Sequence, residues 1–195
     1  MNVPNKLTIS RFVLTAAFLS FILTDVPGNE VVALLLFSTA SLTDYFDGQI
    51  ARRDNLITNF GVLMDPLADK ILVCSAFIAF VGRGWMPAWM VVIVVARELA
   101  ITGLRLLAAS KHLLLAAEGF GKHKTISQIV AIISLLVEHS YGQMGVIGGI
   151  FSFHVSGQPW VFWFAQVSLW VAIILTFTSG AIYLWRNRAL YLSDL

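Results

Sequence analysis

Four aspartates lie close together in the first half of the chain. Four carboxylates that converge at low dielectric cannot all stay ionised without cations, because like charges a few ångströms apart repel each other strongly. Neither cysteine nor histidine accompanies them, and ligands that are all oxygen suit Mg²⁺ or Mn²⁺ rather than zinc. We therefore predict a site for two divalent metal ions, Mg²⁺ or Mn²⁺, held by Asp44, Asp47, Asp65 and Asp69.

Small and polar residues surround this cluster. Gly48 leaves space beside the carboxylates for a planar group or a backbone, and Arg52 follows one helical turn later, where it can pair with a phosphate. Thr58 begins the next helix, whose free N–H groups favour an anion. These features together indicate a diphosphate site. Each has a simpler reading as well: Arg52 as an anchor at the membrane surface and Thr58 as a helix cap. Asn5 and Thr8 likewise could bind a donor phosphate or cap the first helix.

Two neighbouring apolar segments carry the aspartates, at about 31–51 and 60–82. Asp44 and Asp47 are three residues apart and share one helical face, and Asp65 and Asp69 share a face of the next helix. The short link between the segments makes the helices antiparallel. Asp44 then lies about as far before the link as Asp69 lies after it, so the carboxylates should meet at matched depth.

The composition of the whole chain indicates a membrane protein. Of 195 residues, 58% are hydrophobic and only 12% are charged, whereas about 25% is usual for soluble proteins. This excludes a soluble enzyme, a disordered chain and a disulfide scaffold. Six apolar stretches are long enough to cross a bilayer, so we expect one all-α, polytopic domain over residues 1–195. Its six transmembrane helices are predicted at about 8–24, 31–51, 60–82, 86–107, 125–148 and 159–185.

The basic residues orient this predicted bundle. Ten of the 13 lysines and arginines fall on one side of it, and only Arg83 falls in a link on the other side. The positive-inside rule therefore places both termini and the aspartate cluster at the cytoplasmic face. A net charge of +2 does not suggest nucleic-acid binding.

The spacing of the cluster resembles the signature of the CDP-alcohol phosphotransferases. From Asp44 to Asp69 the chain reads Asp, two residues, Asp-Gly, two residues, Ala-Arg, eight residues, Gly, three residues, Asp, three residues, Asp. The runs NVPNKLTISR, DPLADK, ARELAITGLR and GKHKT look like the branch of this family whose acceptor is sn-glycerol 3-phosphate. Together these motifs cover most of residues 2–128.

The resemblance implies transfer of the phosphatidyl group of CDP-diacylglycerol to the hydroxyl of sn-glycerol 3-phosphate, with release of CMP. It also implies two metals, a homodimer and a bacterial plasma membrane. By position, Asp44, Asp47 and Asp65 resemble metal ligands, and Asp69 resembles the residue that is both metal ligand and general base. Contacts with the nucleotide lipid would come from Gly48, Arg52 and Thr58.

A charged acceptor needs its own phosphate-binding residues. The best-supplied basic region on the cytoplasmic side consists of Arg105, Lys122 and Lys124, although the positive-inside rule alone could explain these charges. Arg97 lies deeper on the same helical face as Arg105 and is a second candidate. Alternatively, Arg97 forms an ion pair with the neighbouring Glu98.

Two rival functions remain at this stage. One is a transferase of the same family with another acceptor, as in the synthases of cardiolipin, phosphatidylserine or phosphatidylinositol phosphate. The other is a divalent-cation transporter, because carboxylates within helices also build ion pathways. All four aspartates lie in the predicted cytoplasmic half, and no acidic chain continues outward, which favours the enzyme.

Overall fold

The chain is almost entirely helical in the computed structural model. The model describes the backbone of residues 3–53, 59–111, 113 and 120–192, and the side chains of residues 8–43, 64–111, 113 and 123–192. Within these ranges six long helices and the short α7 (Arg188–Leu192) form the fold. The long helices are α1 (Val3–Ile22), α2 (Asn29–Arg53), α3 (Asn59–Gly82), α4 (Ala88–Ser110), α5 (Phe120–Ser140) and α6 (Trp160–Arg186).

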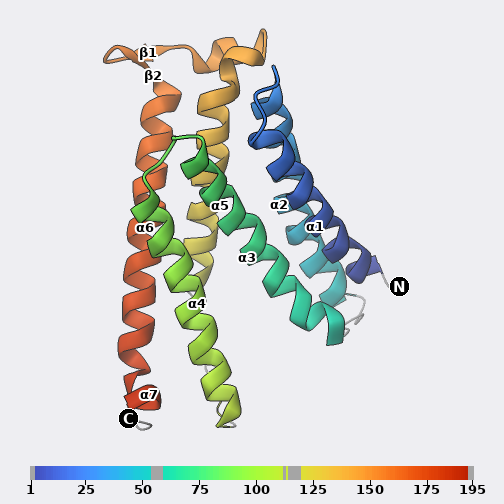
Figure 1. Ribbon diagram of the computed structural model, residues 1–195, viewed down its shortest axis with the longest axis vertical. Coiled ribbons are helices and arrows are strands. Elements are labelled where there is room, and N and C mark those ends of the chain that lie inside the picture. Colours follow the sequence, from blue (N-terminus) through green and yellow to red (C-terminus); the bar gives the residue numbers. More distant parts are fainter. Residues whose placement is uncertain (1–2, 54–58, 112, 114–119, 193–195) are drawn as a thin grey trace.

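The long helices lie side by side in one elongated bundle (Figure 1). Helix α1 packs against α2 and α3, while α6 packs against α4 and α5. Helix α3 also contacts α4 and α5, so it connects the two halves of the bundle. Helix α3, which carries Asp65 and Asp69, therefore contacts α1, α4 and α5 as well as α2.

Aromatic packing holds α3 in place. Phe18 of α1 and Phe37 of α2 are fully buried, with ring centroids 5.7 Å apart. Phe77 and Phe80 of α3 are equally buried in the same core, where their rings meet edge to face. Burying side chains of this size is the main favourable term available to such a core. The core thus fixes the position of α3 several turns from its two aspartates.

The prediction for the fifth helix was wrong at its end. A helix was expected over 125–148, but α5 ends at Ser140. Glycines explain the difference, since Gly145 has a positive φ of 57° that a continuing helix does not allow. The chain then crosses the end of the bundle in short elements (Figure 1): the 3₁₀ helices η1 (Tyr141–Gln143) and η2 (Ile147–Phe151), and the antiparallel strands β1 (His154–Val155) and β2 (Gln158–Pro159).

Helix α6 is the one helix in the described part of the chain that is long and apolar enough to cross a membrane by length and composition. Shorter apolar helical stretches occur at Thr8–Ile22 and Asn29–Thr43. The expected all-helical class is confirmed, whereas the six membrane spans and the cytoplasmic termini remain predictions.

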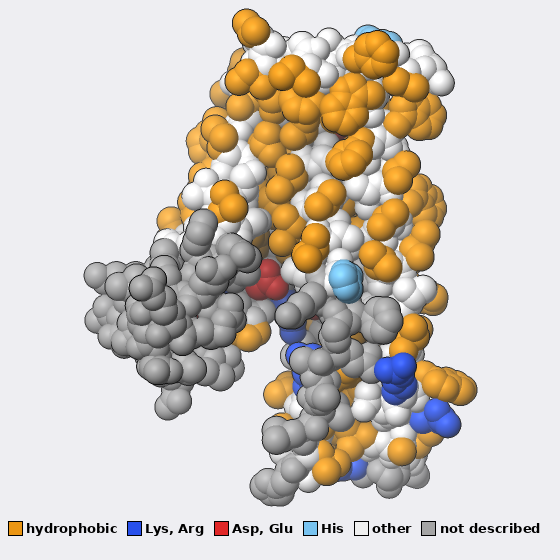
Figure 2. Space-filling view, turned by 180° about the vertical axis from the view of Figure 1, so that it is seen from behind, with side chains coloured by type: hydrophobic (Ala, Val, Ile, Leu, Met, Phe, Trp, Pro, Cys, Tyr) orange, Lys and Arg blue, Asp and Glu red, His pale blue; other side chains and the backbone are white. Residues whose placement is uncertain are grey.

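The surface has two chemically different ends. Figure 2 shows hydrophobic side chains over the half of the bundle that ends in β1 and β2, and lysines and arginines over the opposite end. Near the β1–β2 end, Arg83 is engaged in ion pairs with Asp25 at 2.5 Å and Glu30 at 3.0 Å. Many large hydrophobic side chains along the helices are exposed, Val92 and Leu99 among them.

Candidate active site

Asp65 and Asp69 lie one turn apart on α3 with half-buried side chains. Thr8 of α1 is fully buried, and its Oγ1 donates a hydrogen bond of 2.5 Å to Oδ1 of Asp65. Thr8 was considered as a phosphate contact or a helix cap. In the structure its hydroxyl contacts one of the predicted metal-ligand carboxylates and so joins α1 to α3. The donor-phosphate role of Thr8 stays a prediction.

The other half of the predicted cluster is described by its backbone alone. Helix α2 carries Asp44, Asp47, Gly48 and Arg52, and it contacts both α1 and α3. Asn5 lies in the first turn of α1. The side chains of these five residues lie outside the described ones. Two further predicted site residues are affected in the same way: Lys122 in α5 by its side chain and Thr58 as a whole.

A small pocket with several charged side chains adjoins Asp69, and we call it the polar pocket. It lies where α3, α4 and α5 meet, and Lys124 of α5 lines it together with Asp69. Lys124 is almost fully buried, and its Nζ donates a hydrogen bond to Oε1 of Glu98. The lining residues are Asp69, Lys70, Val73, Cys74, Glu98, Lys124, Thr125 and Gln128.

Glu98 is shared between two cations. Besides Lys124, Nη1 of Arg97 lies 3.2 Å from the same Oε1 atom. The Glu98 side chain is only 9% exposed, and a buried carboxylate is costly unless it is paired and hydrogen-bonded. The ion pair between Arg97 and Glu98 that the sequence suggested is therefore present. It belongs to a three-residue network that reaches the polar pocket.

Arg105 lies elsewhere. Its side chain is exposed, and its guanidinium carbon lies 5.9 Å from the centre of the Tyr183 ring of α6. Such a cation–π contact stabilises the packing of an arginine on a neighbouring helix, and it requires no ligand. Of the three basic residues predicted to bind the acceptor, the structure thus brings Lys124 next to Asp69 and leaves Arg105 outside the polar pocket.

Several polar-pocket residues were not singled out from the sequence as site residues. Glu98 was considered only as a partner of Arg97. Lys70 donates a hydrogen bond to Oγ1 of Thr102 on α4, and Gln128 is 1% exposed. One signal was available, since an ionisable residue within an apolar helix is functional more often than not. Periodicity alone did not reveal which helix faces meet.

The described donor atoms suit a hard divalent cation. Asp65 and Asp69 offer carboxylate oxygens one turn apart, and Thr8 orients one of them. Among the residues with described side chains no group of three or more metal-binding residues occurs. Asp44 and Asp47, which complete the predicted set, are not among them. An oxygen-only donor set of this kind fits Mg²⁺ or Mn²⁺.

A family model described as CDP-alcohol phosphatidyltransferase matches residues 1–178. The chain belongs to this family. Members similar to it include a CDP-diacylglycerol–glycerol-3-phosphate 3-phosphatidyltransferase of Bacillus subtilis (strain 168), 38% identical over 95% of both chains. An enzyme of the same name from Rickettsia bellii (strain RML369-C) is 33% identical over 93% of both chains. A probable phosphatidylglycerophosphate synthase of Mycobacterium tuberculosis (strain ATCC 25618 / H37Rv) is 36% identical over 95% of this chain and 81% of the relative.

The family match confirms the resemblance found in the residues from Asp44 to Asp69. It also extends beyond the motifs, since it covers α1 to α5 and most of α6. Residues 129–178, which lie beyond the motifs found in the sequence, are therefore part of the family match.

Proposed function

We propose that the protein transfers the phosphatidyl group of CDP-diacylglycerol to the hydroxyl of sn-glycerol 3-phosphate, forming phosphatidylglycerophosphate and CMP. One observation carries this proposal. The complete aspartate signature from Asp44 to Asp69 occurs in a chain that is similar, over nearly its whole length, to relatives named for this reaction.

Two divalent ions, Mg²⁺ or Mn²⁺, are proposed to bind Asp44, Asp47, Asp65 and Asp69. When bound, they neutralise the diphosphate and stabilise the charge on the leaving CMP. The hydrogen bond from Thr8 to Asp65 supports this site, because metal ligands are commonly oriented by a second residue. The donor lipid would be bound by Asn5, Thr8, Gly48, Arg52 and Thr58.

Asp69 is proposed as the general base. It accepts the proton of the acceptor hydroxyl while the oxygen attacks the lipid-side phosphorus, and the bond from that phosphorus to the oxygen of CMP breaks. Support for this role comes from the polar pocket, where Asp69 lies beside a buried lysine. A base must lie within reach of the hydroxyl it deprotonates, and Lys124 can hold the phosphate of the same small acceptor.

For the acceptor phosphate we propose Lys124 and, two residues earlier on α5, Lys122. Lys124 is paired with Glu98, and this ion pair keeps its ammonium group buried. An incoming phosphate can replace Glu98 as the partner of the ammonium. Arg105 is the weaker of the three original candidates, because its guanidinium already lies over Tyr183.

A membrane location follows from the same proposal, since CDP-diacylglycerol is a lipid. We propose six membrane spans in the cell membrane, both termini and the site at the cytoplasmic face, and a homodimer. Support comes from the apolar helix α6 and from the basic residues gathered at one end of the bundle (Figure 2). The similar bacterial relatives favour a bacterial plasma membrane.

An acceptor panel tests the function. Purified protein with labelled CDP-diacylglycerol and Mg²⁺ should form labelled phosphatidylglycerophosphate with sn-glycerol 3-phosphate. A chelator should abolish product, and added Mg²⁺ should restore it. Product with serine, inositol phosphate or phosphatidylglycerol instead would identify another acceptor. Metal flux into liposomes without any nucleotide-lipid turnover would support the transporter.

Removing the hydroxyl of Thr8 should weaken metal binding. In Thr8→Val the Asp65 carboxylate loses its 2.5 Å hydrogen bond while the shape of the side chain is kept. Loss of such an orienting contact typically costs about 10- to 100-fold in metal affinity. We expect a loss in the lower part of this range, measured as Mn²⁺ binding to the metal-free protein by electron paramagnetic resonance.

Thr15→Val is the matched control for this change. Thr15 is also buried on α1, but its Oγ1 donates to the backbone oxygen of Arg11 and not to a carboxylate. The control should keep wild-type Mn²⁺ affinity. Equal affinities in both variants would show that Thr8 does not orient a metal ligand.

A further inference from the structure

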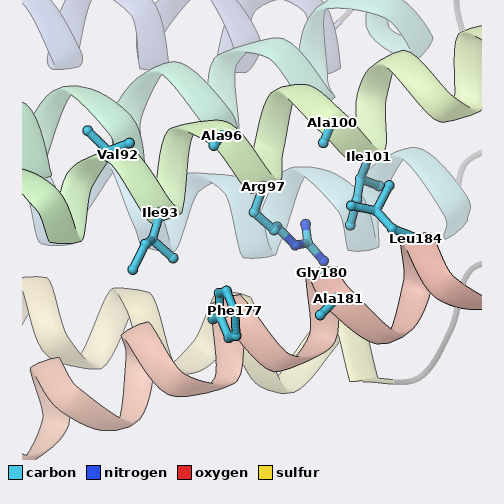
Figure 3. A pocket seen from close by; sticks show the side chains of 10 residues that line it. All are labelled: Val92, Ile93, Ala96, Arg97, Ala100, Ile101, Phe177, Gly180, Ala181 and Leu184. Carbon is cyan, nitrogen blue, oxygen red and sulfur yellow. The ribbon is translucent and has the colours of Figure 1, made fainter.

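Arg97 lies in an unusual place for an arginine, between α4 and α6. It lines a cavity of about 340 Å³ whose other lining side chains are all apolar, among them Ile93, Ile101 and Phe177. Figure 3 shows its side chain leaving α4 and extending toward α6 beside Gly180. Within the described residues, Nε of Arg97 is buried without a hydrogen-bond partner, and Nη1 is directed to Glu98 at 3.2 Å. The guanidinium therefore depends on Glu98 for its charge partner.

Gly180 makes this path possible. A Cβ atom added at Gly180 would lie 2.7 Å from Cγ of Arg97 and 3.6 Å from its Cβ. Contacts below 3.0 Å essentially do not occur between such atoms, so any larger residue would force the arginine stem or the helix to move. Gly180 is buried inside the long helix α6, where glycine is otherwise unfavourable by comparison with alanine. Its lack of a side chain is what the arginine requires.

The same face of α6 also contacts a residue that lines the polar pocket. Thr176 lies one turn before Gly180 and is fully buried, and its Oγ1 accepts a 2.9 Å hydrogen bond from Nε2 of Gln128. Gln128 lines the polar pocket. Two successive turns of α6 are thus connected to residues that line the polar pocket. Thr176 is hydrogen-bonded to Gln128, and the space left by Gly180, which we call the notch, is occupied by Arg97, the partner of Glu98.

We propose that Gly180 is a positioning residue for acceptor binding. The notch at Gly180 seats the stem of Arg97, so that its guanidinium shares the Glu98 carboxylate with Lys124. Because Glu98 is divided between two cations, Lys124 is held in the polar pocket without being fully neutralised, and it stays able to bind the acceptor phosphate. This inference rests on the proposed function, and it gives α6 a role in the choice and affinity of the acceptor.

A methyl group added at Gly180 should therefore change the KM for only one of the two substrates, the acceptor. If Arg97 turns away from the notch, Glu98 is left to Lys124 alone, and a tighter ion pair competes with the acceptor phosphate. Weakening one charged hydrogen bond typically costs a factor of about ten. In Gly180→Ala we expect the KM for sn-glycerol 3-phosphate to rise about tenfold, with little change in the KM for CDP-diacylglycerol.

Gly103→Ala is the matched control. Gly103 is also a helical glycine, on α4, and an added Cβ there has nothing within 4 Å. This variant should keep both KM values. A wild-type acceptor KM in Gly180→Ala would overturn the proposal. So would an equal rise of both KM values together with a lower melting temperature, because that pattern indicates separation of α4 and α6.

A double-mutant cycle separates positioning from packing. Arg97→Ala removes the Cγ atom that the new methyl would meet, so Gly180→Ala should have no further effect on the acceptor KM in that background. Additive effects would overturn the proposed coupling. Failure of the proposed function is distinguishable, because the wild-type protein would then give no product with sn-glycerol 3-phosphate in the first place.

Discussion

Asp69→Asn should keep the affinity for CDP-diacylglycerol at saturating Mg²⁺, while turnover with sn-glycerol 3-phosphate falls by about 10²- to 10⁴-fold, the usual contribution of a general base. The amide keeps one oxygen and the shape of the side chain, but it cannot take up the proton of the acceptor hydroxyl. The position of Asp69 in the polar pocket beside Lys124 makes this the largest effect that we expect from a single substitution.

Turnover and donor binding are measured separately for this variant. Product formation gives kcat, and retention of the labelled nucleotide lipid by the purified protein gives donor affinity. Asp25→Asn provides the matched control, because Asp25 has a 90% exposed side chain and pairs with Arg83 near the β1–β2 end. Comparable activity of Asp69→Asn and the wild type would remove Asp69 from the role of base.

Lys124→Gln should raise the KM for sn-glycerol 3-phosphate by about 10- to 100-fold, the range expected for one hydrogen bond to a charged group. The substitution removes the buried ammonium and leaves Glu98 to Arg97. The KM for CDP-diacylglycerol should stay near its wild-type value, since the donor contacts are proposed to come from α1, from α2 and from Thr58, none of which includes Lys124.

Arg105→Gln is the informative comparison for Lys124. The two residues were equal candidates in the sequence, yet Lys124 lines the pocket of Asp69 and Arg105 lies exposed over Tyr183. We expect Arg105→Gln to keep the acceptor KM within about twofold, as is usual for exposed charges. A strong rise of the acceptor KM in Arg105→Gln, with no rise in Lys124→Gln, would reverse this assignment of the acceptor site.

The helices were predictable because hydropathy and periodicity are local properties of the chain. Five of the six long helices begin and end within five residues of their predicted bounds, and the largest of these differences is the start of α1, at Val3 instead of residue 8. The exception, the end of α5, shows the limit of that reasoning. The stretch after Ser140 is apolar enough to continue a span, but its glycines, with Gly145 at positive φ, favour turns over a helix.

In the candidate site, too, local features could be predicted from the sequence, whereas contacts between distant helices could not. The spacing from Asp44 to Asp69 is confined to two neighbouring helices, so the sequence alone was sufficient to identify the family and to predict a metal-dependent diphosphate site. Thr8 was noticed, but its partner was not, because the hydrogen bond to Asp65 joins two helices that are far apart in the sequence. A hydroxyl in an apolar helix does not reveal which carboxylate it will meet.

What the sequence by itself determined, therefore, is the chemistry: an all-helical chain, four aspartates at family spacing, and basic residues gathered on one side. Only the tertiary structure decided which basic residue accompanies Asp69. That choice depends on how α3, α4 and α5 rotate against one another, and a rotation of one helix is set by packing along its whole length. For the same reason only the fold placed Gly180 against Arg97. The close approach of two helices does not change the hydrophobic periodicity of either one, so the sequence pattern does not predict it.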